Sequence, residues 1–162
     1  MISLTPLIQL LSAKPAGFAH AWFRDVAGAA EFAQVRVEAL PLPACWLVRA
    51  ADKIEDVDNE GRAADVGLGF DAIIAIENTR TQRAGETDDV LLAYRHAVRT
   101  LLQGWEIEPD INPIQFKGGR VLEYTQQDMY WADRYAFNAL ITNYLPDPGP
   151  FSELVYTGAP AL

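Results

Sequence analysis

Apolar and polar positions alternate most regularly between Met129 and Leu145, late in the chain. One face of this segment is apolar except for Asp133 and Asn143, and the other face is mixed and mostly polar. A period of two with one apolar face is typical of a half-buried strand. The pattern therefore predicts a long strand here, at the centre of a sheet.

Two further strands are predicted in the first half of the chain. Residues 44–50 form a short apolar run, and residues 66–77 alternate with one apolar face. Gly67 and Gly69 interrupt the second run, and a glycine inside a strand marks a bend or the close approach of another backbone. The charged stretch 52–65 has few large apolar residues, so it is interpreted as a long exposed hairpin connection.

A fourth strand is expected over residues 114–125, immediately before the long one. Gly118 and Gly119 fall inside this run, where they can turn or bulge the chain. A shorter extended piece is predicted from His20 to Val26.

Two helices are predicted from apolar stripes at helical spacing. The first begins at Thr5-Pro6, because proline suits the first helical position, and it ends at the Lys14–Gly17 breaker. The second begins at Thr87 and ends at Gly104. Its stripe holds Val90, Leu91, Tyr94, Ala97, Val98, Leu101 and Leu102, and Arg95, His96, Arg99 and Gln103 are placed away from it.

The predicted order is helix, strand, strand, helix, strand, strand. Two hairpins, each preceded by a helix, favour an α+β fold with an antiparallel, mainly four-stranded sheet and helices packed on one face. A length of 162 residues suits one domain, which we expect in residues 1–145. Residues 146–162 are rich in proline and glycine, so we expect an extended or flexible C-terminal arm.

The chain is acidic, with 22 Asp and Glu against 13 Lys and Arg and a net charge of −9. This balance argues against non-specific nucleic-acid binding, which needs cations to neutralise phosphates. A single cysteine allows neither an internal disulfide nor a thiolate zinc cluster. The first residues lack the pattern of a signal peptide, and no apolar run approaches the ~20 residues that cross a bilayer, so no membrane association is expected.

The candidates for chemistry are few, and each has a structural interpretation. Asp88 and Asp89 could form a metal pair, but carboxylates in a first helical turn already suit the helix dipole. His20 and His96 are far apart and have no third ligand at metal-binding spacing. Cys45 lies in an apolar strand, which favours a buried inert thiol over a nucleophile. No glycine-rich phosphate loop is present either. Taken together, these observations lead us to expect no cofactor, no metal and no enzymatic activity.

Three charged positions carry more weight. A carboxylate on an apolar face, as at Asp133, is a site candidate if it is unpaired; the alternatives are a partner such as Arg120 or Lys117, or a contact between subunits. Arg80 and Arg83 form a compact basic loop in an acidic protein. That loop is either a solvated turn or a contact to an acidic neighbouring subunit.

Seven segments in order carry a family resemblance: Leu42-Pro43-Ala44, the VGLGFD run 66–71, the TDDVLLAYR run 87–95, the LQGW run 102–105, the VLEY run 121–124, the YWADRY run 130–135 and the NYLP run 143–146. The series resembles the tail terminator proteins of long-tailed bacteriophages and Mu-like prophages, over roughly residues 18–146.

The resemblance implies an α+β subunit that assembles into a homo-hexameric ring. Such rings cap the tail tube, stop its polymerisation and offer a surface for joining the head. The implied partners are further copies of the chain, the tail tube protein and a head-completion or connector protein. The implied location is the virion tail or neck, after assembly in the cytoplasm of the bacterial host.

Other functions stay open beside this one. The nearest is another neck component, such as a head–tail joining or tail-completion protein. An enzyme using Asp133 or the Asp88-Asp89 pair and a small binding module are alternatives of other classes. For the structural function, we expect Arg80, Arg83, Asp133 and Arg134 to contribute to subunit or tube contacts. The stretch 52–65 and the segment 146–162 are candidate inter-subunit arms that the resemblance does not assign.

Overall fold

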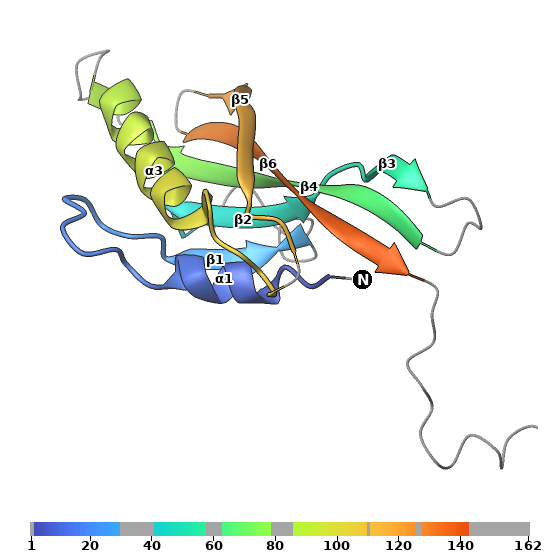
Figure 1. The fold of residues 1–162 in the computed structure, drawn as a ribbon. Coiled ribbons are helices and arrows are strands. Elements are labelled where there is room, and N and C mark those ends of the chain that lie inside the picture. The colour runs from blue at the N-terminus through green and yellow to red at the C-terminus, as the bar shows by residue number, and fades with distance from the viewer. Residues whose placement is uncertain are drawn as a thin grey trace, which may run out of the picture.

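A computed structural model describes residues 2–29, 41–57, 63–78, 86–109, 111–125 and 128–142. Its helices and strands, shown in Figure 1, are α1 (Thr5–Ser12), β1 (Asp25–Gly28), β2 (Ala44–Arg49), β3 (Lys53–Val57), β4 (Ala63–Glu77), α3 (Glu86–Leu102), β5 (Gln115–Tyr124) and β6 (Asp128–Thr142). The six strands form one sheet in the order β1-β2-β4-β6-β5, and β3 also pairs with β4.

The predicted α+β class is confirmed, but the antiparallel four-stranded sheet and its order were wrong. The sheet is mixed, because β1 runs parallel to β2. It has six strands, because β3 lies within the stretch 52–65 that was interpreted as a connection. Every residue of β3 is exposed. A strand with no buried face has no apolar alternation, so its sequence resembles that of a loop.

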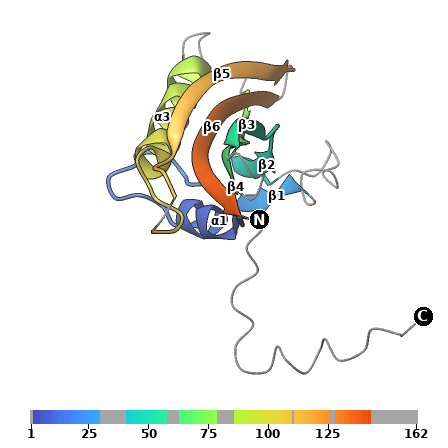
Figure 2. The same cartoon turned by 45° about the vertical axis from the view of Figure 1, so that its right-hand side comes forward.

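The longest pairing in the sheet joins β4 and β6, which run antiparallel from Glu77 opposite Asp128 to Ala63 opposite Thr142. The predicted long strand is confirmed as β6, an interior strand between β4 and β5. Figure 2 shows β5 and β6 strongly curved. Residues 143–145 of the predicted strand lie outside the described residues.

The glycines of β4 allow β2 and β3 to follow one another along the same edge. β2 pairs with the second half of β4 and β3 with the first half. At the junction the Ala50 amide donates to the Gly69 carbonyl oxygen at 2.9 Å. A Cβ on Gly69 would lie 3.2 Å from the carbonyl oxygen of Ala51. The predicted close approach of another backbone is therefore confirmed at this position.

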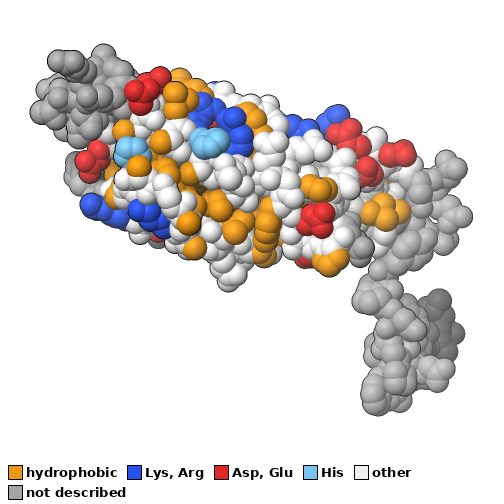
Figure 3. Space-filling model, turned by 60° about the vertical axis from the view of Figure 1, so that its left-hand side comes forward, with side chains coloured by type: hydrophobic (Ala, Val, Ile, Leu, Met, Phe, Trp, Pro, Cys, Tyr) orange, Lys and Arg blue, Asp and Glu red, His pale blue; other side chains and the backbone are white. Residues whose placement is uncertain are grey.

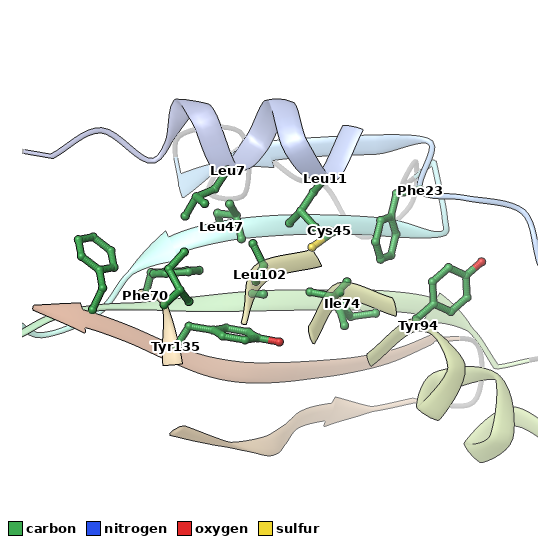
Figure 4. Packing of buried hydrophobic residues seen from close by; sticks show 14 of the residues in the cluster. Leu7, Leu11, Phe23, Cys45, Leu47, Phe70, Ile74, Tyr94, Leu102 and Tyr135 are labelled. Atoms are coloured by element: carbon green, nitrogen blue, oxygen red, sulfur yellow. The ribbon is translucent and has the colours of Figure 1, made fainter. Parts of the chain in front are cut away.

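One face of the sheet, here called the core face, carries both described helices. Figure 4 shows α1 and α3 side chains packed against those of β2, β4 and β6. The largest fully buried members of this cluster are Leu7, Leu11, Leu47, Phe70, Ile74, Leu91, Leu102, Ile114 and Tyr135. Cys45 is buried among them, and burial raises the pKa of its thiol, as expected for an inert cysteine.

The opposite face, here called the second face, divides along the length of β6. Near the start of β6 it carries a separate buried apolar cluster of Leu42, Ala44, Trp46, Ile73, Ala75, Tyr130 and Ala132. Near the end of β6 it carries the exposed side chains of Leu140 and Thr142. The polar face predicted for this strand is therefore buried over its first part and exposed over its last.

Removing the Tyr135 hydroxyl tests the core. Phe70 stacks on this ring at 5.5 Å between centroids, and the hydroxyl is buried without a hydrogen-bond partner among the described residues. An unpaired buried polar group costs ~1–3 kcal/mol. We expect Tyr135→Phe to keep the free energy of unfolding unchanged or raise it by about 1 kcal/mol, measured by urea denaturation. A loss larger than about 1 kcal/mol would show instead that the hydroxyl is paired.

Candidate functional site

Asp133 lies on the core face of β6, where α3 crosses the strand, and its side chain is 0% exposed. The guanidinium of Arg95, on α3, donates hydrogen bonds to this carboxylate: Nη2 is 2.8 Å from Oδ1, and Nε is 3.1 Å from both oxygens. Trp131 Nε1 donates to Oδ1 at 2.8 Å. Charge-assisted bonds of this kind are among the strongest that proteins make, so the carboxylate is fully engaged inside the subunit.

Two neighbours complete this cluster. The guanidinium of Arg95 lies over the Trp131 ring, 4.2 Å from its centroid, as in a cation–π contact. A Cβ on Gly119 would lie 2.1 Å from Asp133 Oδ1 and 2.6 Å from Trp131 Nε1. Glycine is therefore required at this position of β5. The predicted bulge is confirmed too, since the β5–β6 register shifts between Phe116 and Gly118.

The predicted partner of Asp133 was wrong: the cation is Arg95, not Lys117 or Arg120. In the register of β5 and β6, Gly119 is opposite Asp133, and Arg120 is opposite Ala132. Arg120 consequently belongs to the second face. The predicted position of Arg95 was wrong too. It was predicted to lie away from the apolar stripe of its helix, but its side chain faces the sheet and contacts Asp133.

The sequence did contain a signal for Arg95. It follows the buried Leu91 by four residues and precedes the buried Val98 by three. That spacing places its side chain on the face of α3 that meets the sheet. A cation on a buried helical face requires an anion opposite it, and the lone carboxylate on the apolar face of β6 supplies one.

Arg134 lies on the second face and pairs with Asp71, the residue opposite it on β4. Its Nη2 donates to Asp71 Oδ2 at 3.0 Å, and its Nε donates to Oδ1. The hydrogen bond to Asp71 raises the pKa of Arg134, against the opposing effect of burial. The Arg134 side chain is half-buried and Asp71 is mostly buried, so this pair is a fixed part of the surface.

Two more cations stand beside this pair. Lys117, Arg120 and Arg134 line one hollow of about 320 Å³ together with Asp71, and we call it the basic hollow. Arg120 Nη2 is 4.0 Å from Asp71 Oδ2, and the Arg120 side chain is 67% exposed. One carboxylate among three cations leaves an excess of positive charge, in a chain whose net charge is −9.

The far end of the sheet has the opposite character. We call it the distal arm: residues 52–57, 63–67 and 138–142, which comprise β3 with the adjoining ends of β4 and β6 (Figure 1). Its acidic side chains are Asp52, Glu55, Asp56 and Asp65, with Lys53 as the basic one. Its exposed apolar side chains are Ile54, Val57, Leu140 and Ile141. Figure 3 shows acidic side chains grouped with hydrophobic ones at this end of the molecule.

The remaining predicted positions divide in two groups. Arg80 and Arg83 lie outside the described residues. Asp88 and Asp89 are exposed at the start of α3, where they suit its dipole. Among the residues that the structure describes, no group of three or more His, Cys, Asp or Glu is placed to hold a metal ion. None of the described helices is both long and apolar enough to span a membrane.

Comparison with known proteins gives one family. The family model described as phage tail terminator protein matches residues 2–144, a span that contains every described helix and strand. No curated protein matches the chain.

Asparagine at position 133 tests the buried cluster. Asp133→Asn leaves the Arg95 guanidinium, 15% exposed, without its counter-charge. Breaking a buried pair on one side costs ~3–5 kcal/mol, so we expect the free energy of unfolding to fall by about 3 kcal/mol in urea denaturation. Arg134→Gln is the matched control, because its pair is partly exposed and is expected to contribute ~1 kcal/mol or less. Equal losses in the two variants would contradict this assignment.

Proposed function

Because the chain belongs to the phage tail terminator protein family, we propose that it caps the tail tube, stops its polymerisation and provides the surface at which the head joins. The observation that carries this proposal is the family match over residues 2–144. A member of this family is a structural component of the phage tail and associates with other tail components. The tube protein and a head-completion or connector protein are the proposed partners.

The proposed assembly is a homo-hexameric ring at the end of the tube. Support comes from two unlike surfaces on one subunit, the basic hollow and the acidic distal arm. A contact between unlike surfaces is head-to-tail, and such contacts close into rings when the rotation permits. In dilute solution we expect a monomer or a weakly associated form, with the ring completed on the tail.

The proposed contact residues differ in how they act. Arg134 contributes directly, since it lines the basic hollow. Asp133 is buried and contributes indirectly, because its ion pair with Arg95 holds α3 against β6. Arg80 and Arg83 remain proposed contacts on the basic character of their loop. The role is non-enzymatic, in keeping with the structural role of the family.

The proposed domain comprises residues 1–145, followed by a C-terminal arm over residues 146–162. The family match supports this boundary, because it ends at residue 144.

The proposal predicts a defect in tail length. Phage particles assembled without this protein are expected to carry tails that exceed the normal length and vary among themselves, because nothing stops tube growth. Negative-stain electron microscopy measures the length distribution, and supplying the wild-type chain should restore it. Tails of normal, uniform length that fail to join heads would contradict the capping role and assign the chain to another neck component, such as a head–tail joining or tail-completion protein.

A further inference from the structure

We propose that the distal arm of one subunit docks against the basic hollow of the next copy of the chain. This inference rests on the ring assembly of the proposed function and specifies the surfaces that form it. The carboxylates of the arm meet the cations of the hollow.

The arm has the composition of a protein contact. All residues of β3 are exposed, including the carboxylates of Glu55 and Asp56. Beside them, Ile54 is 65% exposed and Leu140 is 67% exposed, with Val57 and Ile141 also exposed. The register places Leu140 with Asp56 and Asp65 on the second face, and Ile54, Val57 and Ile141 on the core face. Large apolar side chains exposed at the end of a projecting segment are typical of an interaction surface. The arm therefore offers both apolar area and negative charge.

The hollow offers the complementary set. Arg120 is largely exposed and reaches only the edge of the Asp71 carboxylate, at 4.0 Å. The Lys117 ammonium donates to the neutral Gln115 side chain at 2.7 Å, so its charge is not neutralised there. Val121 follows Arg120 on β5 and is 51% exposed, but it is opposite Trp131 and so belongs to the core face, whereas Arg120 belongs to the second face. The hollow therefore offers positive charge, the complement of the carboxylates of the arm.

These two surfaces cannot neutralise one another within a single subunit. Asp65 and Asp71 both lie on the second face of β4, and they are opposite Leu140 and Arg134 of β6. Six residues of strand separate them, which corresponds to about 20 Å. A salt bridge needs its two charged atoms within a few ångströms, so the cations of the hollow do not reach the arm of their own subunit. Within the arm Lys53 Nζ lies 3.0 Å from Glu55 Oε1, and one cation beside four carboxylates leaves an excess of negative charge.

A second copy is the partner that fits both surfaces at once. One contact uses the arm of one subunit and the hollow of the next. The first subunit of such a row still has a free hollow and the last a free arm, or the reverse, so the same contact can be repeated. Repetition of a head-to-tail contact closes a ring. Complementary charge also suppresses arm-to-arm and hollow-to-hollow contacts, because like charges repel. The arrangement therefore specifies direction around the ring.

Charge reversal in the full-length chain tests this contact. The arm variant is E55K/D56K and the hollow variant is K117E/R120E. Controls with the same charge change at other exposed sites are D89K/E106K and K14E/R24E. Self-association is measured by analytical ultracentrifugation over a concentration series, and thermal unfolding checks that each variant is folded.

Each reversal is expected to weaken self-association at least about tenfold, whereas the controls leave it unchanged. The quadruple variant, with both surfaces reversed, is expected to recover to within about threefold of wild type. An equimolar mixture of the arm variant and the hollow variant is also expected to associate. In that mixture each lysine-bearing arm meets a glutamate-bearing hollow, and each acidic arm meets a basic hollow. Rescue by mixing distinguishes a direct contact from loss of folding.

Several results would overturn the inference. The inference fails if the arm variant and the hollow variant each self-associate as strongly as wild type. The proposed function would still stand in that case, provided that the wild-type protein caps tails. Weaker self-association in the hollow variant but not in the arm variant would show that the hollow binds an acidic segment other than the distal arm. Loss of salt-sensitive DNA binding in the hollow variant, with self-association unchanged, would assign it to nucleic acid. If wild type forms no ring in solution or on tails, the proposed assembly fails together with this contact.

Discussion

The antiparallel pairing of β4 with β6 is the constraint on which the rest of the subunit depends. It joins fifteen residues of each strand without a break in register. The other edge of β4 then carries β2 and β3 in succession, and the other edge of β6 carries β5. Since a shift of one residue would exchange the two faces of the sheet, this register also decides which charges are buried and which are exposed.

The consequence is clearest at Asp133 and Arg134, which are neighbours in the sequence and belong to opposite faces. Asp133 is enclosed with Arg95 and Trp131 beneath α3, where a charge is tolerated because it is paired and hydrogen-bonded. Arg134 pairs with Asp71 at the surface and lines the basic hollow. Two adjacent charges thus have different physical roles, one in positioning a helix and one at a surface.

The ends of the same ladder explain why the subunit has surfaces suited to assembly. Near the start of β6 both faces are covered by apolar clusters. Beyond Ala139 the strand continues with exposed Leu140 and Ile141, and β3 extends beside it with every residue exposed. Strands that project beyond their own core leave apolar side chains in water, a cost that a partner removes when it covers them. The same sheet therefore provides the core of one subunit and a surface for another.

Local pattern determined the α+β class, the two described helices, the long strand β6 and the glycine positions where backbones approach. It did so because each of these has a side-chain period that reports burial on one face. The ordered series of segments also identified the family. Three features required the tertiary structure: the bounds and parallel pairing of β1, which overlaps the extended piece predicted over His20–Val26 only at Asp25 and Val26, the exposed β3, and the pairing of Asp133 with Arg95. β1 has four residues and β3 has no buried face, so neither carries a periodic signal. The ion pair joins residues 38 apart in the chain, and their meeting depends on how α3 crosses β6. Local sequence specifies which face of an element is buried; the packing of elements decides which side chains meet there.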